Sequence, residues 1–174
     1  MDFPTLHEQQ QWWNQWIATY RTEQIGIDSQ RQAQEVLRWT EQIRGALQRP
    51  LDIIDVGCGS GWRCELLAGY GTVTGTDLAD AAIARARERR GDIRYIAGDI
   101  MALDLPLQSF DLVVSLEVLS HVADQPAFVA KLASLLRPGG VLIIANQNRW
   151  VLERNESVQP RGWDRSASGR LQAS

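Results

Sequence analysis

Three glycines at alternate positions, Gly57, Gly59 and Gly61, come directly after a short apolar run at residues 52–56. An apolar run of this length that ends in glycines is typical of a buried β-strand. Glycine permits a tight turn and lets the backbone approach a ligand closely. Because helical spacing resumes at residue 64, the segment predicts a strand, a glycine-rich loop and a helix, the context of a nucleotide-binding loop. The same pattern also fits a loop that only packs a helix onto a strand.

The chain beyond this loop alternates between short runs of strand-forming residues and helical patterns. Strands are expected at residues 52–56, 72–76, 93–97, 110–115 and 141–145. Helices are expected at residues 64–69, 80–90 and 126–136, with Asp80 as the N-cap of the second. Such alternation predicts βαβ units and a mostly parallel sheet. The expected fold class is therefore α/β, a three-layer αβα Rossmann-like domain over residues 50–150.

Two aspartates follow the next two expected strands. Asp77 ends the strand at 72–76, where an acidic side chain can accept hydrogen bonds from ribose hydroxyls. Asp99 follows the strand at 93–97. Because open α/β sheets bind ligands at the carboxyl ends of their strands, both aspartates join the glycine loop as candidate ligand-binding residues. Asp77 also fits a helix cap, and Asp99 fits an ordinary turn.

As a set, these motifs resemble those of the class I S-adenosylmethionine-dependent methyltransferases. The resembling segments are residues 55–61, 75–78, 98–100, 110–122 and 135–144. The first resembles the family's D-x-G-x-G-x-G motif, the next two its ribose and adenine positions, and the last two its fourth strand and the turn into its fifth. The resemblance implies S-adenosylmethionine as cofactor, bound by Asp55, Gly57, Cys58, Gly59, Gly61, Asp77, Leu78, Asp99, Ile100, Leu116 and Glu117.

The implied activity is methyl transfer from S-adenosylmethionine to a small-molecule acceptor. His121 lies in the segment that the resemblance places near the reacting centre, where it is either a general base or a structural residue. Two alternatives stay open: a catalytically inactive protein that only binds S-adenosylmethionine, and an NAD-binding Rossmann enzyme. Dehydrogenases usually carry a third glycine where this chain has Trp62, which argues against the second alternative.

Residues 1–49 predict a helical segment. Thr5 and Glu8 form a capping box for a helix over residues 5–24, and Trp12, Trp16 and Tyr20 share one face of it. These aromatic side chains either pack against the sheet or form a lid over an acceptor pocket. A second helix is expected from Asp28 or Ser29 to about residue 48.

Composition limits the classes of partner and the cellular compartment that are expected. The formal net charge is −3, which gives no electrostatic reason to expect nucleic acid or an anionic membrane as partner. Two cysteines are too few for a disulfide scaffold, and no metal site is expected. No signal peptide or membrane-spanning run is visible, so a reducing cytoplasmic location is expected.

The carboxyl-terminal part departs from the family pattern. The family fold normally continues after strand five with a helix and two antiparallel strands, whereas residues 151–174 predict an irregular tail. Strand five would then be an open edge. Three explanations are that the chain is truncated after strand five, that this edge pairs in a homodimer, or that the tail arises from a frameshift.

Overall fold

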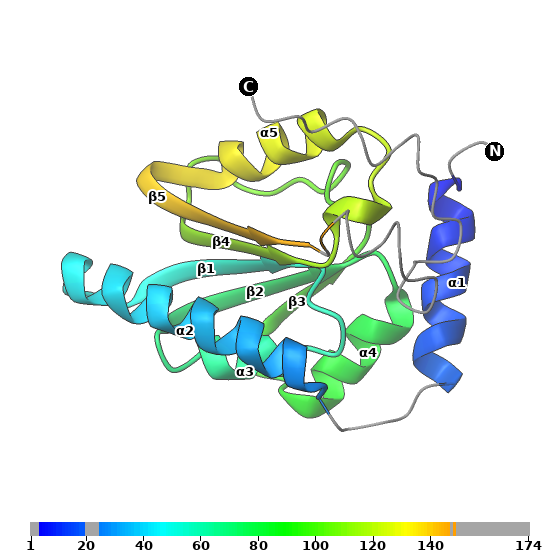
Figure 1. Cartoon of the computed structure of the whole chain (residues 1–174), viewed down its shortest axis with the longest axis horizontal. Helices are drawn as coiled ribbons and strands as arrows, with labels where there is room; N and C mark the ends of the chain where they lie inside the picture. The colour runs from blue at the N-terminus through cyan, green and yellow to red at the C-terminus, as the bar shows by residue number, and fades with distance from the viewer. Residues whose placement is uncertain (1–3, 20–24, 147, 149–174) are drawn as a thin grey trace.

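The computed structural model describes residues 4–19, 25–146 and 148, and in this part the chain folds around one five-stranded sheet (Figure 1). The strands are β1 (Leu51–Val56), β2 (Gly71–Asp77), β3 (Arg94–Ala97), β4 (Phe110–Leu116) and β5 (Leu136–Ala145). All neighbouring strands are parallel, in the order β3-β2-β1-β4-β5. The α/β Rossmann-like fold expected from the alternating pattern is therefore confirmed.

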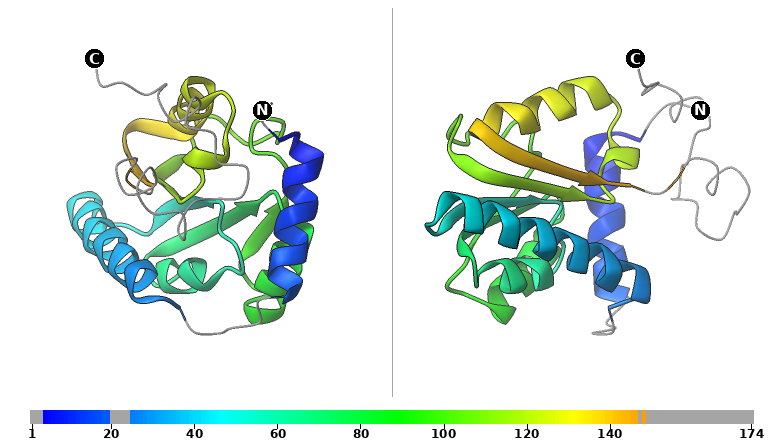
Figure 2. Two further views of the ribbon diagram at one scale, coloured as in Figure 1. Left: turned by 45° about the vertical axis from the view of Figure 1, so that its right-hand side comes forward. Right: turned by 60° about the vertical axis from the view of Figure 1, so that its left-hand side comes forward.

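Helices cover both faces of the sheet, as the two views of Figure 2 show. One face carries α2 (Ile27–Leu47), α3 (Trp62–Leu67) and α4 (Asp80–Arg89), and the other carries α5 (Gln125–Leu135). Alternate residues of β1 divide between the two layers, since side chains of a strand point to opposite faces. Ile53 packs in the core of the first face, whereas Ile54 packs with Phe128 of α5 in the second.

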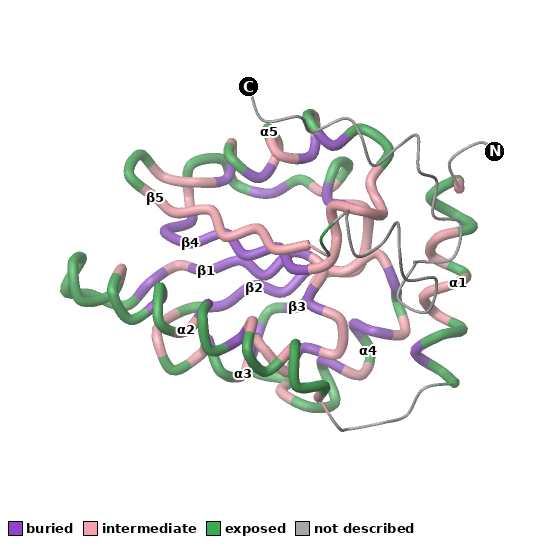
Figure 3. The backbone as a smooth tube through the Cα atoms, viewed as in Figure 1, coloured by how far each residue is buried: buried purple, intermediate pink, exposed green. Residues whose placement is uncertain are grey.

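β5 is the least covered strand of the sheet. Every residue of β4 is buried, whereas β5 is half-buried along most of its length (Figure 3). β5 also begins earlier than expected, at Leu136. Its register with β4 shifts between Phe110 and Leu112, where β5 has an irregular stretch that includes Gly139 with a positive φ. Among the described residues β5 is an edge strand, so pairing of this edge in a homodimer stays a prediction. The expected tail at 151–174 lies outside the described residues.

Helix α1 (Leu6–Thr19) lies across the end of the sheet where the strands finish (Figure 1). Its expected capping box is confirmed, because the Thr5 N–H and hydroxyl both donate to Glu8 Oε2, at 2.8 and 2.7 Å. The face that packs is not the expected aromatic face: Trp13 and Ile17 pack against α4, whereas Trp16 is 43% exposed. Tyr20 lies outside the described residues.

Polar side chains fix α1 to the start of α4. Gln10 Nε2 donates to the carbonyl oxygen of Leu78 at 3.1 Å, and Asn14 Oδ1 accepts from the Ala81 N–H at 3.0 Å. Asn14 thus satisfies an amino-terminal N–H of α4 from another helix. The expected caps are wrong for two helices, because α4 has Ala79 as its N-cap in place of Asp80, and α2 starts after Gly26. No helix in the described ranges is long and apolar enough to cross a membrane.

An ion cluster holds the opposite end of the sheet, where β1 and β4 begin. Asp111 is only 3% exposed and accepts from both terminal nitrogens of Arg49, at 2.9 and 2.6 Å. It also accepts from the Asp52 N–H at 2.8 Å and pairs with Arg137 at 3.0 Å. Burial opposes ionisation, but these donors outweigh it and lower the pKa of Asp111 to about 2. The cluster therefore ties the loop before β1 to β4 and β5.

Candidate functional site

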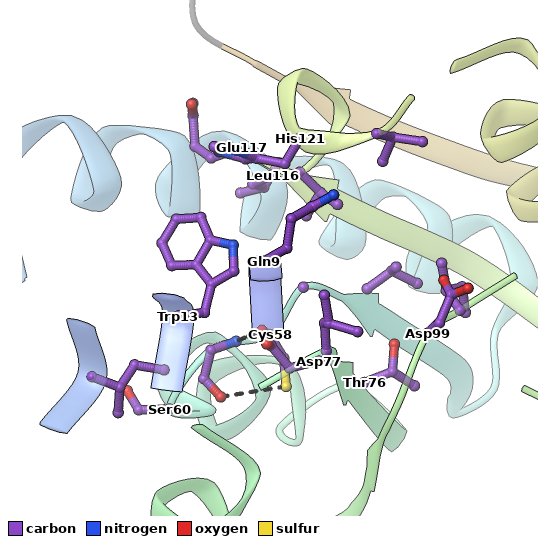
Figure 4. Close-up of a pocket in the computed structure, with 18 of the residues that line it drawn as sticks. Gln9, Trp13, Cys58, Ser60, Thr76, Asp77, Asp99, Leu116, Glu117 and His121 are labelled. Atoms are coloured by element: carbon purple, nitrogen blue, oxygen red, sulfur yellow. Dashed lines mark hydrogen bonds between the residues drawn. The ribbon is translucent and has the colours of Figure 1, made fainter. Parts of the chain in front are cut away.

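A cavity of about 690 Å³ lies where β1, β2 and β4 end, partly walled by α1 and by the start of α2 (Figure 4). Ligand pockets in proteins typically measure roughly 300–1,000 Å³. In the view of Figure 4, Leu116, Glu117 and His121 lie on one side of the cavity, and Cys58, Thr76 and Asp77 lie on the other. The cavity therefore occupies the crevice that open α/β sheets use for ligands.

Asp77 at the end of β2 faces the glycine loop. Its Oδ2 accepts from the Gly59 N–H and its Oδ1 from the Ala79 N–H, both at 2.9 Å. The loop is held to the same strand a second time, because the N–H groups of Gly57 and Cys58 donate to the Thr76 carbonyl. Burial raises the pKa of Asp77, although the two N–H donors act in the opposite direction. The carboxylate and the loop thus form one preorganised wall of the cavity.

Glycine is required at the three loop positions for different structural reasons. A Cβ at Gly59 would meet nothing within 4 Å, so this position borders open space. A Cβ at Gly57 would collide with Val118, and one at Gly61 would lie 2.6 Å from Tyr95 Oη and 2.9 Å from Ala86 Cβ. All three have positive φ, which glycine adopts without strain. Gly61 is therefore needed for packing and does not line the cavity.

Asp55 does not line the cavity either. It is fully buried on the α3 side of β1, where Arg63 donates to it at 3.3 Å and the Cys64 thiol at 3.7 Å. The same Arg63 nitrogen donates to the Gly57 carbonyl at 3.2 Å. Alternation along β1 explains this placement, because Ile53 and Asp55 point to the same face. The structure therefore gives Asp55 the task of bracing the loop.

The remaining candidate cofactor residues are brought together around the cavity. They are Gly57, Cys58, Gly59, Asp77, Leu78, Asp99, Ile100, Leu116 and Glu117. Asp99 also accepts from the Met101 N–H at 3.1 Å, which is the turn role that the sequence left open. That these residues bind a cofactor stays a prediction.

Cys58 lines the cavity, but its thiol is expected to be a poor nucleophile. Contact with the Cys64 thiol and burial raise the pKa of the Cys58 thiol. Because the thiolate is the reactive form of cysteine, a thiol held protonated is a poor nucleophile. Both cysteines are free and buried. We therefore expect no covalent chemistry at Cys58, and its place among the candidate cofactor residues stays a prediction.

His121 borders the cavity at the short 3₁₀ helix Leu119–His121. Its ring meets the edge of Trp13 from α1, with ring centroids 5.0 Å apart. Burial lowers the pKa of His121 to about 4. The ring is therefore neutral at physiological pH and a weaker base than ordinary imidazole, which favours packing over proton transfer. The catalytic assignment of His121 stays a prediction.

An NMR titration checks the state of His121 directly. We expect its ring signals to keep the shift of the neutral form from pH 8 down to about pH 5, because burial disfavours the imidazolium. The chain has two histidines, so the variant His7→Gln leaves one histidine signal and secures its assignment. A titration midpoint near 6.5 would show instead that the ring is solvated.

The sequence anticipated one contribution of the amino-terminal helices to this site, because the lid alternative included Trp16, which lines the cavity. It missed the other contributions. Gln9 and Trp13 of α1 and Gln32 of α2 all line the cavity. Gln32 donates to Glu117 Oε1 at 2.7 Å. A glutamine in an amphipathic helix carries no sequence signal for such a role. Within the described residues, no three His, Cys, Asp or Glu side chains gather as metal ligands.

Known proteins match the part of the chain that carries the glycine loop and the ends of β2 and β4. The model of the methyltransferase domain family matches residues 54–144. A probable S-adenosylmethionine-dependent methyltransferase of Mycolicibacterium smegmatis is 41% identical over 101 residues, 56% of this chain and 38% of that protein. A ubiquinone biosynthesis O-methyltransferase of Chelativorans sp. is 39% identical over 104 residues, 57% of this chain and 41% of that protein. The chain thus spans about two fifths of the length of these relatives.

A solved structure supports the same grouping. An amino pentose methyltransferase of Micromonospora echinaspora, solved with S-adenosylmethionine bound, superposes with a TM-score of 0.59 and 30% identity. The match covers 74% of this chain and 60% of that one. The family model covers more than half of the 174 residues and includes the glycine loop, Asp77 and the end of β4. This chain therefore belongs to the class I S-adenosylmethionine-dependent methyltransferase family.

Proposed function

We propose that this protein binds S-adenosylmethionine and transfers its methyl group to a small-molecule acceptor. The observation that carries the proposal is the Asp77 carboxylate, which faces the Gly59 loop across one wall of a ligand-sized cavity. Family membership supports the activity, as do relatives that are named as methyltransferases.

The residues present fit the cofactor. Adjacent strands β3 and β2 bring Asp99 and Asp77 to neighbouring positions, where they would meet the adenine and the ribose. Gly59 leaves room for the ligand beside the backbone. When bound, S-adenosylmethionine supplies a methyl group activated by a positively charged sulfur. The contribution of the chain is to fix the position of both reactants, since alignment alone can lower a barrier substantially.

The acceptor side of the cavity favours a small molecule with an apolar part. Trp13, Trp16 and Ile17 of α1 line it, together with Val122 and Phe128. The net charge of −3 offers no general attraction for a nucleic acid backbone. One relative is named for ubiquinone biosynthesis and one solved structure is named as an amino pentose methyltransferase, and both names are in keeping with a small-molecule acceptor.

Calorimetric titration with S-adenosylhomocysteine tests the cofactor assignment. We expect saturable binding with one site per chain and a rise in the melting temperature, because a ligand that binds only the folded state stabilises it. NAD should cause neither effect. Binding of NAD without binding of S-adenosylhomocysteine would overturn the proposal in favour of a dehydrogenase-like enzyme.

Transfer of a labelled methyl group to a panel of small hydroxyl and amine acceptors tests the activity separately. Cofactor binding without transfer to any acceptor would support the binding-only alternative. The two free, buried cysteines support a reducing compartment, and we infer a cytoplasmic location that cell fractionation can check.

A further inference from the structure

Glu117 has an unusual backbone for a glutamate. It directly follows β4, its φ is +61°, and its N–H donates to the Ala145 carbonyl of β5 at 2.8 Å. Non-glycine residues adopt this left-handed conformation rarely, and such residues concentrate at binding and catalytic sites. The consequence here is that the half-buried side chain lines the cavity.

A helix outside the family-matched segment holds the carboxylate of Glu117. Gln32 of α2 donates from Nε2 to Glu117 Oε1 at 2.7 Å, across 85 positions of sequence. The ion pairs of the described residues do not include Glu117, so Gln32 orients its charge without neutralising it. Among the described residues, the second carboxylate oxygen of Glu117 and the second N–H of the Gln32 amide have no hydrogen-bond partner, so both can serve a ligand.

The strand order places Gln32 and Glu117 at a defined distance from Asp77, where the ribose is expected. Across the sheet, β2 ends at Asp77, β1 ends at the glycine loop and β4 ends beside Glu117. Two strand spacings separate Asp77 from Glu117, about 10 Å. Val118 lies against Gly57, which confirms that the end of β4 adjoins the loop. A ligand with its ribose at Asp77 and its tail over the loop therefore ends at Glu117.

We propose that Glu117 binds the ammonium group of the amino-acid end of S-adenosylmethionine and that Gln32 is the positioning residue that holds Glu117 for this contact. The inference rests on the proposed function and deepens it. The chemistry agrees, because the amino-acid end of the cofactor carries a cation and Glu117 offers an oriented anion. A hydrogen bond between charged groups is stronger than a neutral one.

A double-mutant cycle with S-adenosylhomocysteine as ligand tests the positioning role. We expect Gln32→Ala to raise Kd about tenfold in the natural background and less than about twofold in the Glu117→Gln background. Glu117→Gln alone should raise Kd about tenfold or more. Gln34→Ala is the matched control, since Gln34 is an exposed glutamine on the same helix.

A second ligand separates positioning from a general effect on the fold. Methylthioadenosine lacks the amino-acid end, and its affinity, measured by competition, should be the same for Gln32→Ala and the natural protein. The inference would be overturned if Gln32→Ala bound S-adenosylhomocysteine as the natural protein does, or if it lost affinity for both ligands equally. Additive losses of affinity in the double-mutant cycle would overturn it as well. Failure of the natural protein to bind S-adenosylhomocysteine would instead refute the proposed function.

Discussion

Replacement of Asp77 by alanine is expected to weaken S-adenosylhomocysteine binding about hundredfold or more. In the proposed complex the carboxylate accepts from ribose hydroxyls, and hydrogen bonds to a charged group contribute about 1.5–3 kcal/mol each. The substitution also leaves the N–H groups of Gly59 and Ala79 without their acceptor, so the loop loses its brace. Calorimetric titration of the natural and variant proteins measures the change.

One further variant separates the charge of Asp77 from its shape, and a second serves as a control. Asp77→Asn keeps one acceptor oxygen for the loop and should bind more tightly than Asp77→Ala but more weakly than the natural protein. Asp104→Ala is the control, because Asp104 is exposed and lies away from the cavity. Affinity for S-adenosylhomocysteine that stays the same in Asp77→Ala would remove the proposed ribose site.

Asp111→Ala should cost the fold about 3 kcal/mol, because removing one member of a buried ion pair leaves its partners uncompensated. Arg49 and Arg137 are 44% and 35% exposed, so water relieves part of the cost and the value lies at the lower end of the usual range. For a chain of this size the melting temperature should fall by about 10 °C. Thermal and urea unfolding measure both quantities.

The pH dependence of the unfolding free energy of Asp111→Ala shows whether the ionised carboxylate of Asp111 is the source of the stability. The pKa of Asp111 is about 2 in the folded chain, below the ordinary carboxyl value of 3.8. The ionised form therefore contributes about 2 kcal/mol of stability above pH 4, which is lost as the pH falls toward 2. The difference in unfolding free energy between natural protein and variant should shrink over this window. The lowered pKa of His121 affects both proteins equally and cancels.

Glu35→Ala serves as the comparison for Asp111→Ala. Glu35 pairs with Arg38 at 2.8 Å, but both side chains are more than half exposed. Exposed ion pairs contribute little to stability. A melting temperature that fell equally in both variants would show that burial of Asp111 has no special weight.

The sequence contained enough to predict the sheet, because its signals are local. Runs of apolar and β-branched residues marked all five strands, and the glycine run marked the loop after β1. The spacing from Gly57 to Asp77 also anticipated that β2 would end beside the loop. Asp55 was expected among the cofactor-binding residues, but both faces of β1 are buried, so the strand pattern could not show that Asp55 lies on the α3 side and braces the loop.

Local sequence patterns could not predict contacts between segments that lie far apart in the chain. In α1 the packing face combines Trp13 and Ile17 with the polar Gln10 and Asn14, whose partners lie in and just before α4. Aromatic spacing alone favoured Trp12 and Trp16, because the pattern rewards apolar residues and ignores hydrogen bonds. The Gln32–Glu117 bond and the left-handed backbone at Glu117 depend on tertiary structure and leave no local signal.

The two ends of β4 have separate tasks. Asp111 near its start belongs to the ion cluster, whereas Glu117 just past its end belongs to the cavity, about 20 Å away along the strand. Perturbations so far apart usually add without coupling. Heat tolerance and ligand choice are therefore independently adjustable in this protein. Protein engineering can therefore stabilise one end of the sheet while it redesigns the ligand site at the other end, and evolution can change the two ends separately in the same way.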